Sequence, residues 1–319
     1  MQKLKIVILD GYRENPGDLS WDWLEKYGEY QTYDKTDQLA VPERIREADV
    51  VFTNKVVLNR TSLKQAQKLK FVVVLAAGYD VVDIKAAKEL GIKVSNTPNY
   101  GSNEVAQMAF AHILEITNNI GKHSLSVKNN GWYQANDWCY WLNPIISLRD
   151  KNIGIIGYGN IGRQVGKIAA AFGMNVIVSE KIKVEDKNVE NVPLDELFKR
   201  ADIITLHCPL TDETKDIICK KNIQKMKDGV IIINTARGPL INEKDIQEGI
   251  KNKKIYAAGL DVLHSEPPKE NDELIMCDGI NITPHISWAA FEARKNIMTI
   301  CEENLKAFLN GENKNIVNF

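Results

Sequence analysis

Short runs of apolar residues alternate with longer amphipathic segments along most of the chain. The runs are continuous, without regular polar interruptions, which is the pattern of strands buried on both faces of a parallel sheet. They form two series, with residues 5–9, 50–52 and 71–75 in the first and residues 153–156, 176–178, 203–206 and 230–233 in the second. The pattern predicts an α/β protein built around parallel sheets.

A break without such runs separates the two series. It contains Pro98, Gly101, a helix predicted from about residue 102 to residue 121, and a loop-like stretch over residues 129–144. A chain of 319 residues also exceeds the size at which a single hydrophobic core stops growing. We therefore expect two domains of ordinary size.

A glycine motif follows the first strand of the second series. Three glycines with G-x-G-x-x-G spacing come directly after residues 153–156, as in the turn that joins strand and helix in dinucleotide-binding domains. The first glycine permits a tight turn, the second lets backbone N–H groups approach a pyrophosphate, and the third lets the helix lie close to the strand. We expect this turn to hold the cofactor with Gly157, Gly159, Asn160, Ile161 and Gly162.

An amphipathic helix is predicted directly after the turn. Ile161, Val165, Ile168 and Phe172 fall on one stripe of it. Gly173 is expected to end the helix, because glycine tolerates the positive φ that often follows a last helical turn.

Glu180 ends the next strand run, roughly 20 residues after the first glycine, where a dinucleotide-binding domain carries an acidic residue. A carboxylate there accepts hydrogen bonds from the adenosine ribose and repels a 2′-phosphate, which favours NAD over NADP. Lys181 and Lys183 follow immediately. A solvated face is the favoured interpretation of these lysines, but they leave the strictness of cofactor choice open.

Composition and charge bear on whether the chain binds nucleic acid, membranes or metals. With 41 basic and 42 acidic residues, the net charge of -1 does not suggest a nucleic-acid or membrane-surface partner. No apolar stretch approaches the roughly 20 residues of a membrane span, and residues 1–10 lack a secretory cleavage pattern, so we expect a cytoplasmic protein. The five cysteines and five histidines show no metal-ligand spacing, so we expect reduced thiols and no metal site.

Four further segments lie around the glycine turn in a characteristic order: residues 76–83, 234–238, 261–268 and 283–288. Together they resemble the D-isomer-specific 2-hydroxyacid dehydrogenase family over nearly the whole chain. The resemblance is closest to the glycerate dehydrogenase, or hydroxypyruvate reductase, branch, through residues 138–141 and 154–163. It implies a Rossmann NAD-binding domain of residues 101–288, inserted into a flavodoxin-like substrate domain of residues 1–100 and 289–319.

The resemblance also implies a reaction, the interconversion of a small D-2-hydroxy acid and its 2-keto acid with NAD, with hydroxypyruvate and D-glycerate as the best guess. His285 would deliver the proton, with Glu266 orienting its ring. Arg237 would grip the substrate carboxylate with its planar guanidinium. The backbone N–H groups of Ala77 and Gly78 would complete carboxylate binding.

Further cofactor contacts are expected at the ends of neighbouring strands. The resemblance places Thr235, Ala236 and Asp261 beside the cofactor, with Asp261 near the nicotinamide carboxamide. His207 and Pro209 end a strand at the edge where such sheets bind ligands, so we expect them to line the site. An acid–base role is disfavoured for four histidines, for which a structural role is expected: His112, His123, His207 and His264.

Residues 132–141 carry a cluster of aromatics on a loop-like segment: Trp132, Tyr133, Trp138, Tyr140 and Trp141. Such a cluster indicates a buried partner surface, and the resemblance implies a homodimer formed by the nucleotide domains. The alternative is a flap that packs within one subunit.

Two other functions stay open. One is a different D-2-hydroxyacid dehydrogenase, acting on D-lactate or a branched 2-keto acid. The other is an NAD(H)-sensing binding protein, like the family's corepressor branch. A formate dehydrogenase is disfavoured, because that branch has glutamine where this chain has Glu266.

Overall fold

The computed structural model describes residues 3–180 and 184–318. The chain forms two compact units, which divide between Gly101 and Ser102 and again between Trp288 and Ala289. The first unit therefore contains the segments from both ends of the chain, and the second is one continuous segment.

The first unit is a parallel five-stranded sheet with the order β2-β1-β3-β4-β5. Its strands are β1 (Leu4–Ile8), β2 (Gly28–Thr32), β3 (Val50–Thr53), β4 (Phe71–Val74) and β5 (Lys93–Ser95). Its helices are η1 (Asp22–Lys26), η2 (Gln38–Ala40), α1 (Val41–Ile45), α2 (Arg60–Gln65), α3 (Ile84–Glu89) and α11 (Phe291–Leu309). This order is that of flavodoxin-like sheets.

Apolar packing covers both faces of this first sheet. Helices α1, α2 and α3 share one hydrophobic core with alternate residues of the strands. On the opposite face α11 contacts β4, where the rings of Phe71 and Phe308 stack with centroids 4.3 Å apart. Because both faces are covered, the strands carry the continuous apolar runs seen in the sequence.

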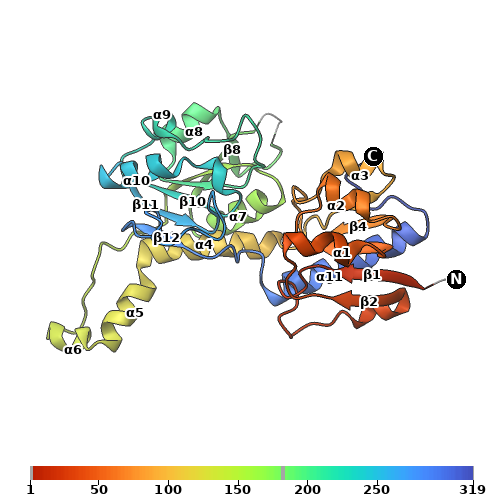
Figure 1. Ribbon diagram of the computed structural model, residues 1–319. Coiled ribbons are helices and arrows are strands. Elements are labelled where there is room, and N and C mark those ends of the chain that lie inside the picture. The colour runs from red at the N-terminus through yellow and green to blue at the C-terminus, as the bar shows by residue number, and fades with distance from the viewer. Residues whose placement is uncertain (1–2, 181–183, 319) are drawn as a thin grey trace. The chain divides into compact units, whose positions relative to one another are not determined.

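The second unit is a seven-stranded parallel sheet with the order β12-β11-β10-β9-β6-β7-β8. Its strands are β6 (Asn152–Ile156), β7 (Asn175–Val178), β8 (Val189–Asn191), β9 (Ile203–Leu206), β10 (Val230–Asn234), β11 (Ile255–Leu260) and β12 (Ile280–Ile282). Helices α4 (Ser102–Asn118) and α7 (Asn160–Ala171) pack on one face, and α8 (Leu194–Arg200), α9 (Lys220–Ile223) and α10 (Glu243–Lys251) pack on the other (Figure 1). Both units are doubly wound α/β folds, so the predicted fold class is confirmed.

All seven strands predicted from apolar runs are present, with ends that differ by at most one residue. Five further strands were missed: β2, β5, β8, β11 and β12. Four of these are edge strands, which need no continuous apolar run because a neighbour pairs with them on one side only. The fifth, β11, is internal, but small residues at Ala257, Ala258 and Gly259 obscure its apolar pattern.

The helix after the glycine turn ends as predicted. Phe172 is the C-cap of α7, and Gly173 follows it with φ +73°. The N–H of Gly173 donates to Ala170 O (3.0 Å) and that of Met174 to Ala169 O (3.1 Å), which is the Schellman arrangement.

Two predictions in the break between the series were wrong. The helix expected to reach residue 121 ends at Asn118, because Asn119 takes a left-handed conformation (φ +52°) and the chain restarts as α5 (Ile120–Lys128). The stretch expected to be loop contains α6 (Gly131–Ala135), bounded by Asn130 and Asn136, both also left-handed. Asparagine tolerates this conformation well, so it can divide one helical stretch into short pieces.

Helices α5 and α6 extend as an arm away from the sheet of their own unit (Figure 1). The three hydrophobic cores of the described chain contain no residue between Ile116 and Leu148. No helix in residues 3–180 and 184–318 has the length and apolarity to cross a membrane.

Candidate active site

The glycine turn lies at the carboxyl end of β6, where the strand order reverses between β6 and β9. Gly157 has φ +96°, and a Cβ there would overlap the backbone nitrogen of Cys208. A Cβ on Gly162 would overlap the carbonyl oxygen of Gly157, so α7 can approach the turn only without a side chain. Gly159, the N-cap of α7, has open space where its Cβ would be. That space at a helix N-terminus fits a pyrophosphate.

Glu180 lies two residues after the end of β7 (Asn175–Val178), with its carboxylate turned toward this turn. Its Oε1 accepts a hydrogen bond from the backbone N–H of Tyr158. The side chain of Asn191 holds the backbone of Glu180, accepting from its N–H (3.0 Å) and donating to its carbonyl (3.2 Å). Lys181 and Lys183, which bear on cofactor choice, lie outside the described residues.

The ends of β9 and β10 continue this edge of the sheet. Leu206 pairs with Asn234, so His207 and Thr235 follow as neighbours on adjacent strands. Nδ1 of His207 and Oγ1 of Thr235 are buried without a hydrogen-bond partner among the described residues. Such orphaned polar atoms beside the open helix end fit a site that a ligand completes.

His207 carries no positive charge that could neutralise a bound anion. Its Nε2 lies 2.8 Å from the hydroxyl of Thr205, and burial lowers the pKa of its ring to about 3. The imidazole is therefore neutral at physiological pH. The neighbouring Pro209 is exposed, and its carbonyl accepts from the hydroxyl of Thr214 (2.7 Å).

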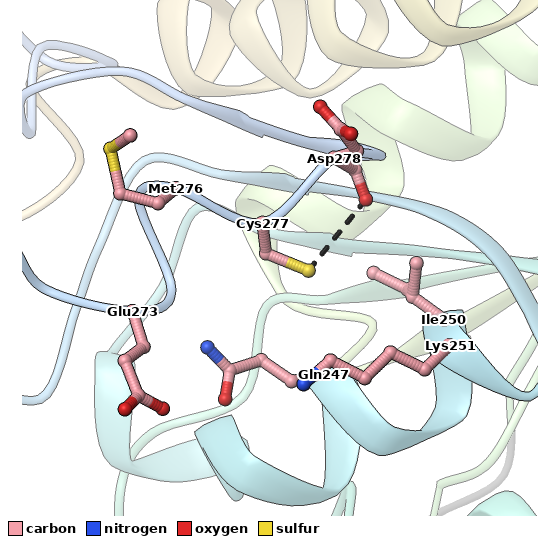
Figure 2. A pocket seen from close by; sticks show the side chains of 7 residues that line it. All are labelled: Gln247, Ile250, Lys251, Glu273, Met276, Cys277 and Asp278. Atoms are coloured by element: carbon pink, nitrogen blue, oxygen red, sulfur yellow. Dashed lines mark hydrogen bonds between the residues drawn. The ribbon is translucent and has the colours of Figure 1, made fainter.

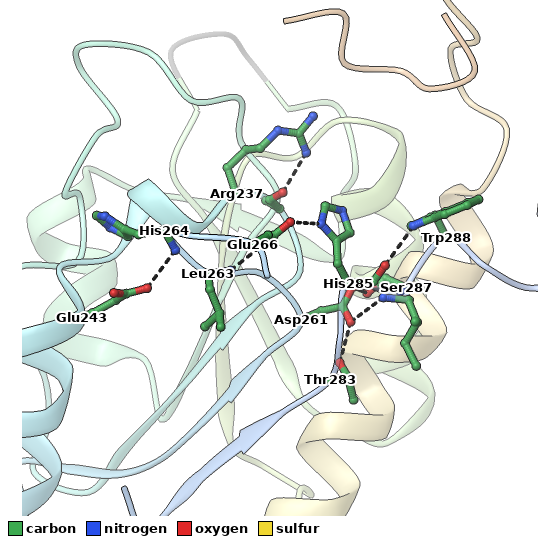
Figure 3. Close-up of polar contacts among 12 residues, drawn as sticks. Arg237, Glu243, Asp261, Leu263, His264, Glu266, Thr283, His285, Ser287 and Trp288 are labelled. Carbon is green, nitrogen blue, oxygen red and sulfur yellow. Dashed lines mark hydrogen bonds and ion pairs between the residues drawn. The ribbon is translucent and has the colours of Figure 1, made fainter. Parts of the chain in front are cut away.

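The three residues expected to catalyse the reaction lie on loops that follow three adjacent strands, β10, β11 and β12. Nδ1 of His285 is 2.6 Å from Oε2 of Glu266, and Figure 3 shows this pair as a direct contact. The other oxygen, Oε1, accepts from the N–H of Leu263 (3.0 Å), which fixes the carboxylate on its loop. Because Nδ1 faces the carboxylate, Nε2 is the nitrogen left for a substrate.

Arg237 is exposed at the end of β10, in a turn that Asn234 organises. Asn234 is buried; its amide donates to Arg237 O (2.8 Å) and its Oδ1 accepts from Ala236 N (3.0 Å). A Cβ on Gly238 would overlap the backbone of Leu263. Glycine there lets the Arg237 turn lie against the loop that carries Glu266. In Figure 3 Arg237 and the Glu266–His285 pair occupy the same region of this edge.

The backbone of His285 is strained. Its φ is +54°, a left-handed conformation that in this chain is otherwise taken mainly by Asn and Asp among the described non-glycine residues. For a residue with a larger side chain this conformation costs on the order of 1–2 kcal/mol. Its neighbours hold it in place, since its N–H donates to Thr283 O (2.9 Å) and its carbonyl accepts from Nε1 of Trp288 (2.9 Å).

Asp261 anchors this strained segment, a role that the sequence did not indicate. The side chain is buried, and both oxygens accept hydrogen bonds. Oδ1 accepts from the hydroxyl of Thr283 (2.5 Å) and the N–H of Ile286 (2.9 Å), and Oδ2 accepts from the N–H (2.8 Å) and hydroxyl (2.5 Å) of Ser287. Figure 3 shows this network beside His285. The partners of Asp261 lie more than 20 residues away on another loop, so no local sequence pattern points to this role.

The expected carboxylate loop belongs to the first unit. Ala77 and Gly78 follow β4 at its carboxyl end, and Ala77 is exposed. The carbonyl of Ala77 accepts from the side chain of Asn96 (2.7 Å), which ties this loop to the residue after β5.

A hollow in the second unit lies elsewhere. Figure 2 shows it between α10 and the segment before β12, and its lining contains none of the predicted site residues: Gln247, Ile250, Lys251, Glu273, Met276, Cys277 and Asp278. The end of α10 and the start of β12 meet at the amino edge of the sheet, opposite the glycine turn. Ligands of such folds bind at the carboxyl edge, so we assign this hollow no part in the site.

Known proteins match the chain over its whole length. Residues 110–287 match the model of the "D-isomer specific 2-hydroxyacid dehydrogenase, NAD binding domain" family. A hydroxypyruvate reductase of Blautia hydrogenotrophica is 49% identical, over 99% of this chain and 100% of its own length. A glycerate dehydrogenase of Methylorubrum extorquens is 34% identical, over 98% of each chain.

A solved structure extends the similarity to the fold. An acyclic imino acid reductase, in complex with NADPH and D-Arg, superposes with a TM-score of 0.87 at 29% identity. The match covers 98% of this chain and 100% of that protein.

Proposed function

Because this chain belongs to the D-isomer specific 2-hydroxyacid dehydrogenase family, we propose that it interconverts hydroxypyruvate and D-glycerate with NAD(H). The observation that carries the proposed chemistry is the 2.6 Å contact between His285 Nδ1 and Glu266 Oε2 on the carboxyl edge of a nucleotide-binding sheet. The choice of substrate draws on the names of the full-length relatives, a hydroxypyruvate reductase and a glycerate dehydrogenase.

When bound, the nicotinamide supplies the hydride for the keto carbon. His285 donates a proton from Nε2 to the keto oxygen as negative charge develops there. Glu266 accepts from Nδ1 and so stabilises the charged ring before transfer and its orientation throughout. The oxidation of the hydroxy acid uses the same atoms in reverse, with His285 taking the hydroxyl proton.

We assign the substrate carboxylate to Arg237 and to the backbone N–H groups of Ala77 and Gly78. The guanidinium of Arg237 presents two parallel donors, which match the geometry of a carboxylate and can also polarise the adjacent keto group. Glycine loops such as the one at Gly78 bind anions through main-chain N–H groups.

We assign the cofactor pyrophosphate to the turn from Gly157 to Gly162, with Thr235, Ala236, His207 and Pro209 along the neighbouring strand ends. We propose that Glu180 binds the adenosine ribose and so favours NAD over NADP, because a 2′-phosphate would meet its carboxylate. The similar solved structure holds NADPH, so the fold by itself does not exclude NADP and the residue at this position matters.

The test is an activity panel with NADH and NADPH against hydroxypyruvate, glyoxylate, pyruvate and 2-ketoisocaproate. We expect the highest kcat/KM for hydroxypyruvate with NADH. A site that hydrogen-bonds the C3 hydroxyl of hydroxypyruvate has no partner for that bond when a substrate with an aliphatic side chain is bound. A higher value for pyruvate or 2-ketoisocaproate would make the chain a different dehydrogenase of the family. Tight NADH binding without turnover of any 2-keto acid would favour the NAD(H)-sensing alternative.

We also propose that the chain forms a homodimer through the arm of α5 and α6. Tyr133 is 88% exposed and Trp138 83% exposed, although such large aromatics are normally covered. The apolar Ile120 and Leu125 of α5 are exposed as well, so the arm exposes several large apolar side chains and contributes none to a hydrophobic core. The alternative of a flap packed within one subunit is disfavoured by these exposures. A monomer at micromolar concentration in analytical ultracentrifugation would contradict the proposal.

A cytoplasmic location of the protein stays a prediction.

A further inference from the structure

His112, for which the sequence predicted only a structural role, reaches the segment that carries His285. It projects from α4, is only 4% exposed, and places Nε2 3.1 Å from Oγ1 of Thr283. The sheet makes room for it, because a Cβ on Gly259 in β11 would come within 2.6 Å of the Cβ of His112. A glycine inside an internal strand is unfavourable by itself and commonly marks a close approach.

The direction of these hydrogen bonds follows from the protons available. The carboxylate of Asp261 already meets four donors and can only accept. The single hydroxyl proton of Thr283 therefore goes to Asp261 Oδ1 at 2.5 Å, and Thr283 must accept from His112. His112 is consequently the tautomer with its proton on Nε2. Burial lowers the pKa of this ring, which is consistent with a neutral donor.

The far end of this chain of hydrogen bonds meets the backbone beside His285. Asp261 accepts from the N–H groups of Ile286 and Ser287, the two residues that follow His285. His285 is held at φ +54°, which a free loop would relax. A carboxylate whose own position is free cannot hold such a backbone, so the orientation of Asp261 matters.

We propose that His112, Thr283 and Asp261 form a positioning relay that holds His285 in the backbone conformation from which its ring meets the substrate. The relay moves no proton; His112 orients Thr283, Thr283 orients Asp261, and Asp261 binds the backbone after His285. This proposal rests on the role proposed above for His285 as proton donor. It makes His112 a positioning residue although it touches neither substrate nor cofactor.

The experiment breaks the relay at two places. His112→Leu removes the first donor, and Thr283→Val removes the hydroxyl while keeping the shape of the side chain. We expect kcat for keto-acid reduction to fall by about three- to tenfold in each, the equivalent of one hydrogen bond, with little change in NADH affinity. His112→Gln keeps an N–H donor and should recover most of kcat. The double variant should lose no more than either single variant, because both break one chain.

Thr117→Val is the matched control. Thr117 is a buried threonine of the same helix whose hydroxyl donates to Ile113 O (2.8 Å), within α4 itself. It should leave kcat unchanged. Unchanged kcat in both relay variants, additive losses in the double variant, or no recovery in His112→Gln would overturn the proposal. If His112→Leu does not fold, Thr283→Val still breaks the chain.

Amide hydrogen exchange provides a readout that needs no turnover. The amides of Ile286 and Ser287 should exchange faster in Thr283→Val and His112→Leu than in Thr117→Val. Faster exchange in a protein that reduces no 2-keto acid would keep the relay and reject the proposed function. Unchanged exchange together with normal wild-type activity would reject the relay alone.

Discussion

The carboxyl groups of Asp261 and Glu14, one from each unit, are both buried beyond the carboxyl ends of parallel strands, and they are held in opposite ways. Asp261 follows β11 and is 1% exposed, and Glu14 lies beyond β1 and is 0% exposed. Asp261 accepts hydrogen bonds from four donors. Glu14 accepts from the amide of Asn54 through Oε1, while its Oε2 has no partner in the described part of the chain.

The difference shows in the charge of Glu14. Burial, and after it the nearby charge of Asp10, raises the pKa of Glu14 to about 8, so the group is protonated at neutral pH. The Oδ1 of Asn54 is also buried without a partner among the described residues. A protonated Glu14 carries the hydroxyl donor that this pair of acceptors lacks.

Burial alone therefore does not decide what a carboxyl group does. Donors from the backbone and from hydroxyls compensate the lost hydration of Asp261, which can then anchor other residues. Glu14 has too few donors and gives up its charge instead. The first arrangement anchors the segment around His285, and the second should make the first unit sensitive to pH.

The largest effect is expected from Asp261→Asn. An amide of the same shape presents N–H groups to donors that need an acceptor, so the segment around His285 should lose its anchor. Removing one partner from a buried charged network costs about 3–5 kcal/mol; if that loss falls on the transition state, kcat should fall by roughly 10²- to 10⁴-fold. Single-turnover reduction of hydroxypyruvate measures this directly. If the single-turnover rate of Asp261→Asn stayed within twofold of wild type, Asp261 would not be an anchor for His285, and the contrast with Glu14 would be wrong.

Glu14→Gln tests the other side of the comparison through stability. In the unfolded chain Glu14 releases its proton near pH 4.5, whereas the folded chain keeps it until about pH 8. The free energy of unfolding should therefore fall as pH rises through this window, by roughly 3 kcal/mol at pH 7. Glutamine cannot ionise, so the variant should lose this slope and be more stable at pH 7 and above.

Urea unfolding between pH 5 and pH 9 checks the Glu14 prediction. Glu47→Gln is the control, because Glu47 is exposed and pairs only at the surface with Lys68, so its loss should leave the slope of wild type in place. A Glu14→Gln variant with the same pH slope as wild type would show that Glu14 is ionised in the folded state.

The smallest effect is expected from Glu266→Gln, at a carboxylate that is about a third exposed. In the proposed mechanism the carboxylate accepts from Nδ1 and holds the ring with Nε2 toward the substrate, whereas a neutral amide accepts more weakly and can present N–H groups instead. Reduction at neutral pH should weaken by about tenfold, which is less than for a buried partner because water screens the pair. The loss should appear in kcat, with NADH affinity little changed.

The rates of Glu266→Gln should be measured where hydride transfer limits the reaction, as shown by an isotope effect with deuterated NADH. A Glu266→Gln variant with the kcat of wild type would leave Glu266 as a structural residue of its loop. His285→Ala should lose activity at every pH in the same measurement.

The sequence by itself determined the features that depend on neighbours along the chain. Continuous apolar runs predicted the internal strands except β11, and the spacing of Gly157, Gly159 and Gly162 predicted the turn between strand and helix. Gly173 predicted a helix end that the structure shows with both expected hydrogen bonds. Each depends on local backbone geometry, which a short stretch of residues specifies.

Only the tertiary structure decided the features that depend on residues far apart. Edge strands such as β2 and β12 exist because a neighbouring strand offers hydrogen bonds, and Gly259 belongs in an internal strand because His112 packs against it. Glu14 and Asp261 are both acidic residues in the sequence, but the donors around each come from other loops. A hydrogen bond depends on distances of about 3 Å, and those distances are set only when the sheet brings its loops together.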